Sequence, residues 1–161
     1  MKNKILELED LLVEVNKHRQ QGKEIVSTSG CFDILHAGHV TYLEEAKRKG
    51  DILIILLNSD TSVKQLKGEE RPIVPQEERA TVIAGLGAVD YVCIFSEKTP
   101  CDIIQKIKPD VVIKGGDYKG KYIPEMDVTA EYGGRVEYVV MVDGCSSTNI
   151  IEKVKRSPRI W

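Results

Sequence analysis

Apolar residues along this chain follow two spacings that alternate. At positions 5, 8, 12 and 15 they recur every three or four residues, which predicts an amphipathic helix ending near Gly22. Residues 52–57 are instead an unbroken aliphatic run, typical of a strand that is covered on both faces. The chain therefore opens with a helix and soon reaches a buried strand.

The same two patterns continue to the end of the sequence. Strands are predicted at 25–28, 52–57, 91–95, 111–113 and 135–142. Helices are predicted at 40–46, from Thr99-Pro100, and from Pro124 to Gly133-Gly134. A last helix is predicted from Ser146, with Ile150, Ile151 and Val154 inside.

Residues 64–78 show no strong period but contain several basic residues and prolines. We interpret them as a mobile basic loop that leads into a helix near Arg79. In that helix, Val82, Ile83 and Leu86 are predicted to face inward.

Strands that alternate with helices predict an α/β fold. We expect a single Rossmann-like domain with a mostly parallel five-stranded sheet and helices on both faces. Its predicted organisation is an N-terminal amphipathic helix at 1–22, the main domain at 23–155 and a C-terminal tail at 156–161.

Composition and charge argue against several classes of function. A formal net charge of −2 over 161 residues offers no general electrostatic attraction to nucleic acid or an anionic membrane. No apolar stretch is long enough to span a bilayer, and the first residues lack the apolar core of a signal peptide, so we expect a cytoplasmic protein. The four cysteines form no C-x-x-C pair, so neither a metal site nor a disulfide framework is indicated.

Two of the three histidines lie in the tetrapeptide His36-Ala37-Gly38-His39. The motif follows Gly30-Cys31-Phe32-Asp33, where a predicted strand passes into a predicted helix. In α/β proteins, phosphates bind at this kind of position. Glycine has no side chain, so the phosphate can approach the backbone, and the helix N-terminus offers free N–H groups. The pair therefore predicts chemistry on a nucleotide phosphate and no metal site.

Further polar segments stand at other predicted strand and helix ends. They are Asn58-Ser59-Asp60, a basic segment with Lys64 and Lys67, Lys114-Gly115-Gly116-Asp117-Tyr118, and Ser146-Ser147-Thr148. Because polar groups at the carboxyl ends of parallel strands face a shared crevice, we expect these segments to meet there.

Together these segments resemble the cytidylyltransferase-like nucleotidyltransferase superfamily. Residues 29–38, 58–60, 66–68, 71–73, 89–91 and 114–118 look most like the adenylyltransferase domain of ADP-heptose synthase. The resemblance covers residues 24–154 and implies transfer of AMP from ATP to D-glycero-β-D-manno-heptose 1-phosphate, giving ADP-heptose and pyrophosphate. Many relatives fuse this domain to a sugar kinase, and we interpret the present chain as a stand-alone form.

The resemblance also implies roles for individual residues. His36, His39 and Lys67 would be catalytic, whereas Asn58, Asp60 and Lys114 would contact the sugar phosphate. The nucleotide-binding set would be Gly30, Cys31, Phe32, Asp33, Gly38, Arg79, Gly115, Asp117, Ser146, Ser147 and Thr148. Mg²⁺ would arrive with ATP, and a homodimer is expected because relatives commonly pair. Neither nucleic acid nor membrane is an expected partner.

The chemistry of this reaction suits such residues. A sugar phosphate needs no strong general base, because its second pKa is ~6 and it arrives as an anion. His36 and His39 are therefore predicted to donate hydrogen bonds to phosphoryl oxygens, and Lys67 to close over the leaving pyrophosphate. The Leu-Lys-Gly match favours Lys67 over Lys64 for this role.

Two alternatives stay open from the sequence. One is a cytidylyltransferase acting on glycerol 3-phosphate or a similar small phosphoester. Such enzymes usually carry an arginine shortly before the Ser/Thr cluster, and residues 141–145 contain none. The other is a nucleotide-binding regulator without catalysis, against which the presence of both histidines and Lys67 argues. The sequence does not identify the sugar.

Overall fold

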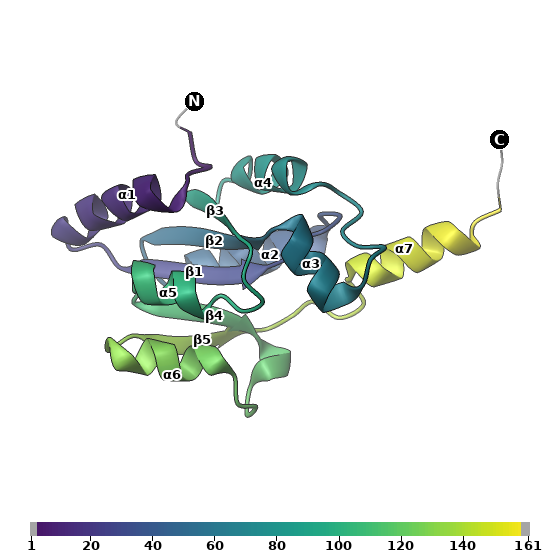
Figure 1. Cartoon of the computed structure of the whole chain (residues 1–161). Coiled ribbons are helices and arrows are strands. Elements are labelled where there is room, and N and C mark those ends of the chain that lie inside the picture. Colours follow the sequence, from purple (N-terminus) through teal and green to yellow (C-terminus); the bar gives the residue numbers. More distant parts are fainter. Residues whose placement is uncertain (1–2, 159–161) are drawn as a thin grey trace.

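Five parallel strands form the central sheet of the protein, in a computed structural model that describes residues 3–158. The strands are β1 (Ile25–Gly30), β2 (Ile52–Asn58), β3 (Tyr91–Phe95), β4 (Val111–Gly115) and β5 (Arg135–Val139). Their order across the sheet is β3-β2-β1-β4-β5 (Figure 1). The order reverses between β1 and β4, so a ligand crevice is expected at the carboxyl ends of these two strands. The predicted α/β class is confirmed, and every pairing in the sheet is parallel.

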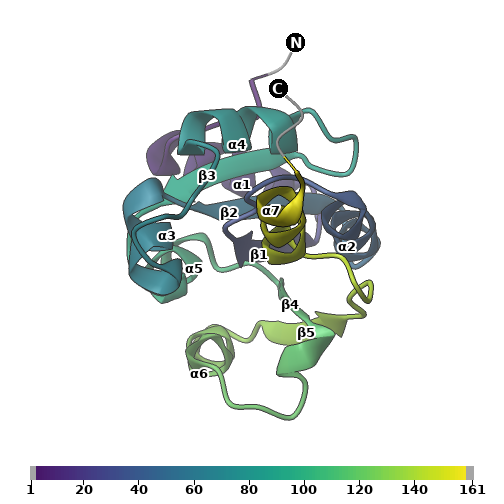
Figure 2. The same cartoon turned by 90° about the vertical axis from the view of Figure 1, so that its right-hand side faces the viewer.

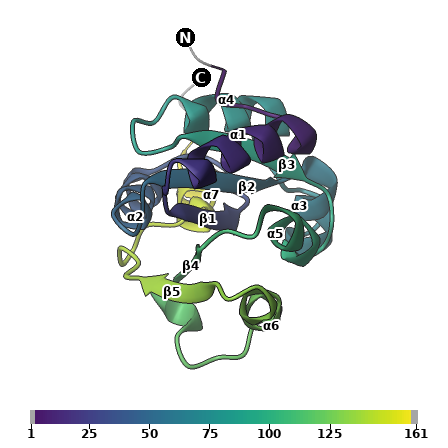
Figure 3. The same cartoon turned by 90° about the vertical axis from the view of Figure 1, so that its left-hand side faces the viewer.

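Helices pack against both faces of this sheet. They are α1 (Leu8–Gln20), α2 (Ala37–Lys47), α3 (Asp60–Lys67), α4 (Gln76–Ala84), α5 (Cys101–Ile107), α6 (Pro124–Glu131) and α7 (Ser147–Arg156), with a short 3₁₀ turn η1 (Gly116–Tyr118). Side chains of α2 and α4 share one apolar cluster, and side chains of α1 and α5 share the other. Figure 3 shows the molecule from the side on which α1 is in front.

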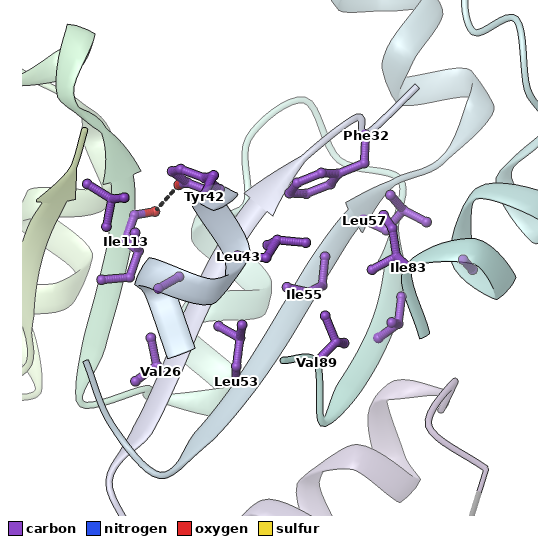
Figure 4. Close-up of a cluster of buried hydrophobic side chains, with 14 of the residues drawn as sticks. Val26, Phe32, Tyr42, Leu43, Leu53, Ile55, Leu57, Ile83, Val89 and Ile113 are labelled. Carbon is purple, nitrogen blue, oxygen red and sulfur yellow. Dashed lines mark hydrogen bonds between the residues drawn. The ribbon is translucent and has the colours of Figure 1, made fainter. Parts of the chain in front are cut away.

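The core is built on β2, whose seven residues are all buried because aliphatic side chains leave both of its faces. On one face, Leu43 of α2 and Ile83 of α4 pack over Leu53 and Ile55 (Figure 4). Tyr42 is the polar member of this cluster, and its hydroxyl donates to the carbonyl oxygen of Ile113 at 3.4 Å. The two apolar layers fix the strand ends that carry the site.

Helix α1 belongs to the same core. Leu11 and Val15 are fully buried against the second face of the sheet. The helix predicted to end near Gly22 therefore packs on the sheet and is part of the domain.

Residues 60–67 form helix α3, so the prediction of a loop throughout 64–78 is wrong for its first part. Ser59 caps this helix by accepting a hydrogen bond from the Ser62 backbone N–H. Only Val63 among the apolar residues of α3 is buried, and such a short polar helix leaves little periodic signal. The loop that remains spans residues 68–75.

Helix α4 turns Val82 outward, with 48% of its surface exposed, although it was predicted to face inward. Ile83 is buried as predicted. Successive residues of a helix point about 100° apart, so Val82 and Ile83 cannot share one narrow face.

The C-terminal part also differs from expectation. Strand β5 ends at Val139, which pairs with Gly115, the last residue of β4, so the strand predicted at 135–142 is too long at its C-terminal end. Val140, just beyond the strand, is 85% exposed. Helix α7 begins after Ser146 as predicted but extends away from the body of the protein (Figure 1). Among its described residues none is buried, and Val154 is 68% exposed, which corrects the prediction that Val154 lies inside. The predicted tail begins at Arg156, still within α7, and its residues 159–161 lie outside the described range.

Candidate functional site

A pocket of about 620 Å³ opens at the carboxyl ends of β1, β2 and β4, where the strand order reverses. In Figure 2 the viewer faces this side, and α7 is seen end-on in front of β1. Most of the residues predicted from the sequence line the pocket: Gly30, Cys31, Phe32, Asp33, His36, Gly38, His39, Asn58, Lys67, Lys114, Gly115, Asp117, Ser146, Ser147 and Thr148. Arg79 and Asp60 are absent from its wall.

The segment after β1 turns sharply to bring the histidines to the pocket. Phe32 and Ile34 both adopt left-handed backbone conformations, with φ of 47° and 51°. A β-branched residue rarely takes this conformation, so the turn holds local strain of the kind common at functional sites. Gly30 permits the turn, since a Cβ there would lie 2.8 Å from Cε2 of Phe32.

His36 and His39 stack on each other at the start of α2. Their ring centroids are 3.8 Å apart with an angle of 22° between the planes, and Phe32 packs on His39 at 5.3 Å. The Nδ1 atoms of both rings are buried and have no hydrogen-bond partner within residues 3–158. The two rings therefore carry buried nitrogen atoms whose hydrogen-bonding capacity is unused among these residues.

Burial favours the neutral form of both histidines in the free protein. Burial lowers the pKa of His36. Burial also lowers the pKa of His39 to about 4, and the nearby His36 adds to this effect while Asp33 opposes it. A neutral imidazole still carries one N–H donor, and anionic phosphate oxygens beside it would favour the protonated form.

Gly38 lets the two histidines sit this closely. A Cβ at this position would lie 2.8 Å from Cβ of Cys145 and 3.0 Å from two atoms of the His36 ring. Cys145 lies in the segment just before α7, so the glycine also brings that segment against α2. Any larger residue would displace one of these neighbours.

Asp33 anchors the loop between α3 and α4. Its carboxylate is 1% exposed and accepts hydrogen bonds from Nε of Arg71 at 2.8 Å and from the backbone N–H groups of Ile73 and Val74 at 2.8 and 2.9 Å. Burial acts to raise the pKa of Asp33, but these hydrogen bonds outweigh it and hold the pKa below its ordinary value. The hydroxyl of Ser147 donates to the Asp33 carbonyl oxygen, so α7 joins the same cluster.

Arg79 lies beneath the pocket and joins segments that lead into it. Its guanidinium donates to the carbonyl oxygens of Val74, Cys31 and Asn58 at 2.7–2.8 Å and to Oδ1 of Asp60 at 2.7 Å. The side chain is 1% exposed. The structure thus places Arg79 as a buried support that pairs with the partly exposed carboxylate of Asp60, and neither residue lines the pocket where a ligand contact was expected.

Lys67 and Lys64 both lie in the last turn of α3, but only Lys67 contributes to the pocket wall. The difference follows from the helix, because residues three apart differ by about 60° in direction. Lys67 therefore remains the lysine of this helix that is placed to bind an anionic ligand in the pocket.

The end of β4 forms another part of the pocket. Lys114 makes an ion pair with Glu125 at the start of α6, and both side chains are largely buried. Its ammonium also lies 3.4 Å from Oγ of Ser29 and 5.6 Å from the centre of the Tyr118 ring. Next to it, a Cβ on Gly115 would lie 2.6 Å from Oδ1 of Asp117, so glycine is needed there.

The start of α7 also faces the pocket. Ser146 is its N-cap and accepts the backbone N–H of Asn149 at 3.0 Å. Ser146, Ser147 and Thr148 all line the wall, so the helix begins beside the bound ligand's expected place. This confirms the predicted cap.

Within residues 3–158, no group of three His, Cys, Asp or Glu side chains is placed to hold a metal ion. The same part of the chain contains no helix long and apolar enough to cross a membrane.

The fold and the pocket define a class of protein. A parallel sheet whose switch-point crevice holds a His-x-Gly-His motif, a lysine and a helix N-terminus is suited to transfer of a nucleotidyl group. Comparison with known families agrees: the cytidylyltransferase-like family profile matches residues 27–153. The chain belongs to the cytidylyltransferase-like family, a family of nucleotidyltransferases.

Two individual relatives show to which members of the family the chain is similar. The chain is 51% identical over 154 residues to the bifunctional protein HldE of Geobacter metallireducens, covering 96% of this chain and 31% of that protein. HldE of Azotobacter vinelandii is 49% identical over 154 residues, with 96% of this chain and 32% of that protein covered. The chain thus spans about a third of the length of these curated relatives.

Solved structures show the same fold. A lipopolysaccharide core biosynthesis protein from Thermoplasma volcanium is 30% identical, with a TM-score of 0.61 over 75% of this chain and 98% of that chain. A pantothenate synthetase from Thermus thermophilus has a TM-score of 0.60 over 92% of this chain and 67% of that one. At 15% identity this second likeness concerns the fold alone.

Sequence reasoning assigned no function to three charged residues of the pocket wall, Arg71, Lys98 and Glu125; the first and last of them form ion pairs with predicted site residues. Arg71 lies in the segment interpreted as a mobile loop, and its partner Asp33 is 38 residues away. Glu125 follows Pro124 in the first turn of α6, where acidic residues are common in any helix. Only the folded chain shows that Arg71 and Glu125 each pair with a residue of the predicted site.

Proposed function

We propose that this domain transfers AMP from Mg²⁺-ATP to D-glycero-β-D-manno-heptose 1-phosphate, giving ADP-heptose and pyrophosphate. The observation that carries the proposal is the stacked pair of His36 and His39 in a pocket that also contains Lys67. The identity of about 50% to proteins named HldE supports the substrate pair, as does the resemblance of the sequence motifs to ADP-heptose synthase.

In the proposed reaction, an oxygen of the sugar phosphate attacks the α-phosphorus of ATP. A new P–O bond forms, the bond from the α-phosphorus to the bridging oxygen breaks, and pyrophosphate leaves with the electron pair. The nucleophile is already ionised at pH 7, so no residue has to remove a proton. His36 and His39 donate hydrogen bonds to the oxygens on which charge builds, and Lys67 neutralises the departing pyrophosphate.

Mg²⁺ enters with the nucleotide in this proposal. The described residues offer no acidic cluster that would hold the ion alone, whereas the oxygens of a triphosphate do. ATP as substrate places the reaction in the cytoplasm, and we propose that location as well. The expected homodimer is also part of the proposal, supported by Val154 of α7, which is 68% exposed, and light scattering after size exclusion tests it.

The deciding experiment is a substrate panel. Pyrophosphate release is measured with ATP or CTP against the heptose 1-phosphate, other sugar 1-phosphates and glycerol 3-phosphate. We expect the highest kcat/KM for ATP with the heptose phosphate. A strong preference for CTP with glycerol 3-phosphate would instead establish the alternative cytidylyltransferase. Absence of turnover with every pair, from protein that binds ATP, would favour a nucleotide-binding regulator.

A further inference from the structure

We propose that Arg71 is a further phosphate-binding residue of this pocket, oriented by Asp33, and that it contacts a phosphate other than the α-phosphate of the nucleotide. This inference rests on the proposed function only in assuming that two phosphorylated substrates meet in the pocket. The phosphate in question is either the terminal part of the triphosphate or the phosphate of the acceptor, and both present the same dianionic chemistry.

The first observation is the position of Arg71. It lies in the loop of residues 68–75, whose neighbours Glu69 and Glu70 are exposed, yet its own side chain is only 13% exposed and lines the pocket. A loop arginine that served solubility would extend into water. This one folds inward and lines the same pocket as Lys67 and the histidines.

The second observation is how its guanidinium is bonded. Nε donates to Oδ2 of Asp33 at 2.8 Å, and the two terminal nitrogens have no hydrogen-bond partner among residues 3–158. Arg79, the other arginine of this region, uses all three of its nitrogens on protein acceptors. The contrast leaves the donor fork of Arg71 available to a ligand, and a planar fork suits two oxygens of one phosphate.

The third observation concerns Asp33. The loop is already attached to its carboxylate by the backbone N–H groups of Ile73 and Val74. The guanidinium is therefore not required to hold the loop in place. What Asp33 gives Arg71 is a fixed direction, so that less conformational entropy is lost when a phosphate binds. Asp33 acts here as a positioning residue, through Arg71.

The test measures binding and turnover separately. Calorimetry gives the affinities of ATP and AMP for the wild type, Arg71→Gln and Arg71→Lys, and kinetics gives KM for the acceptor. Loss of a charge-assisted hydrogen bond to phosphate predicts a weakening of about 10- to 100-fold in Arg71→Gln. Arg71→Lys keeps the charge but loses the fork, so its loss is expected to be intermediate. Arg48→Gln, an exposed arginine at the end of α2, is the matched control and should change nothing.

The pattern of losses identifies the phosphate. Weaker binding of ATP with unchanged AMP assigns Arg71 to the terminal phosphates. Unchanged affinity for both nucleotides with a raised KM for the acceptor assigns it to the acceptor phosphate. Equal weakening of ATP and AMP would overturn the inference, because it signals general damage to the pocket. So would wild-type values throughout.

Asp33→Asn should show the same selective pattern, together with reduced stability, since it also releases the Ile73 and Val74 amides. Should Asp33→Asn fail to fold, the two Arg71 variants still decide the question. The nucleotide affinities need no sugar, so they remain informative if the wild type fails to make ADP-heptose. In that case the proposed function is refuted, while the inference about Arg71 is still tested by the nucleotide affinities.

Discussion

Arg79 provides the sharpest test of the difference between the site expected from the sequence and the site in the structure. The motif resemblance predicts that Arg79 contacts the nucleotide. The structure instead gives it a buried position and four protein acceptors, three of them backbone carbonyl oxygens. We therefore expect Arg79→Met to act mainly on stability, because Met fills part of the volume but donates no hydrogen bond.

The size of the effect follows from these contacts. Hydrogen bonds from a charged donor contribute about 1.5–3 kcal/mol each. Removing one partner of a buried charged network costs about 3–5 kcal/mol. For a domain with a total stability of about 5–15 kcal/mol this is a large fraction. Arg79→Lys, which reaches fewer of the four acceptors, should lose less.

Urea unfolding followed by circular dichroism measures this effect. With a slope of about 2 kcal/mol per molar, the midpoint of Arg79→Met should fall by about 1.5–2.5 M while the slope stays unchanged. Arg48→Gln is again the control and should unfold near the wild-type midpoint. If Arg79→Met unfolds with the wild type but no longer binds ATP, the supporting role is refuted and the direct nucleotide contact is established.

Three further predictions follow from the pocket. The pKa of His39 is about 4 in the folded protein and near 6.5 in the unfolded chain, so the unfolded chain binds more protons between these pH values. The melting temperature of the free protein should therefore fall as the pH drops from 6.5 to 4. In His39→Gln, this dependence of the melting temperature on pH should be weaker. Gly38→Ala should lower kcat/KM at least about tenfold with the protein still folded, because the new methyl group meets His36 and Cys145; wild-type turnover would contradict the tight packing. Lys67→Gln should lower turnover without moving the unfolding midpoint, whereas Lys64→Gln on the same helix should match the wild type in both measurements.

Much of the fold is visible in the sequence because it depends on local patterns. The aliphatic run of 52–57 cannot be stable on a surface, and it is indeed the buried centre of the sheet as β2. The His36–His39 motif is equally local, since four consecutive residues at a helix start bring both rings together. Such features require no knowledge of the rest of the chain.

Features that depend on distant partners were missed. The resemblance placed Asp33 in the nucleotide pocket, which it lines, but did not indicate that its carboxylate bonds to residues 38 to 41 positions away. Nothing in either segment alone marks that pairing. Arg79 likewise looks like any first-turn helix residue until the fold brings Cys31 and Asn58 to it. Helix α3 escaped detection because a short polar helix depends on its cap and on tertiary contacts.

The cluster at Asp33 has a consequence for how the protein assembles. It joins the end of β1 to a loop about 40 residues later and to α7 at a separation of 114 residues. Because these contacts join segments that are far apart in the chain, we expect the pocket to be completed late in folding and to open more readily than the centre of the sheet. The amides of Ile73 and Val74 should therefore exchange with solvent far sooner than those of β2, and a bound nucleotide should slow them most. Substrate binding would then stabilise the folded pocket in addition to occupying it.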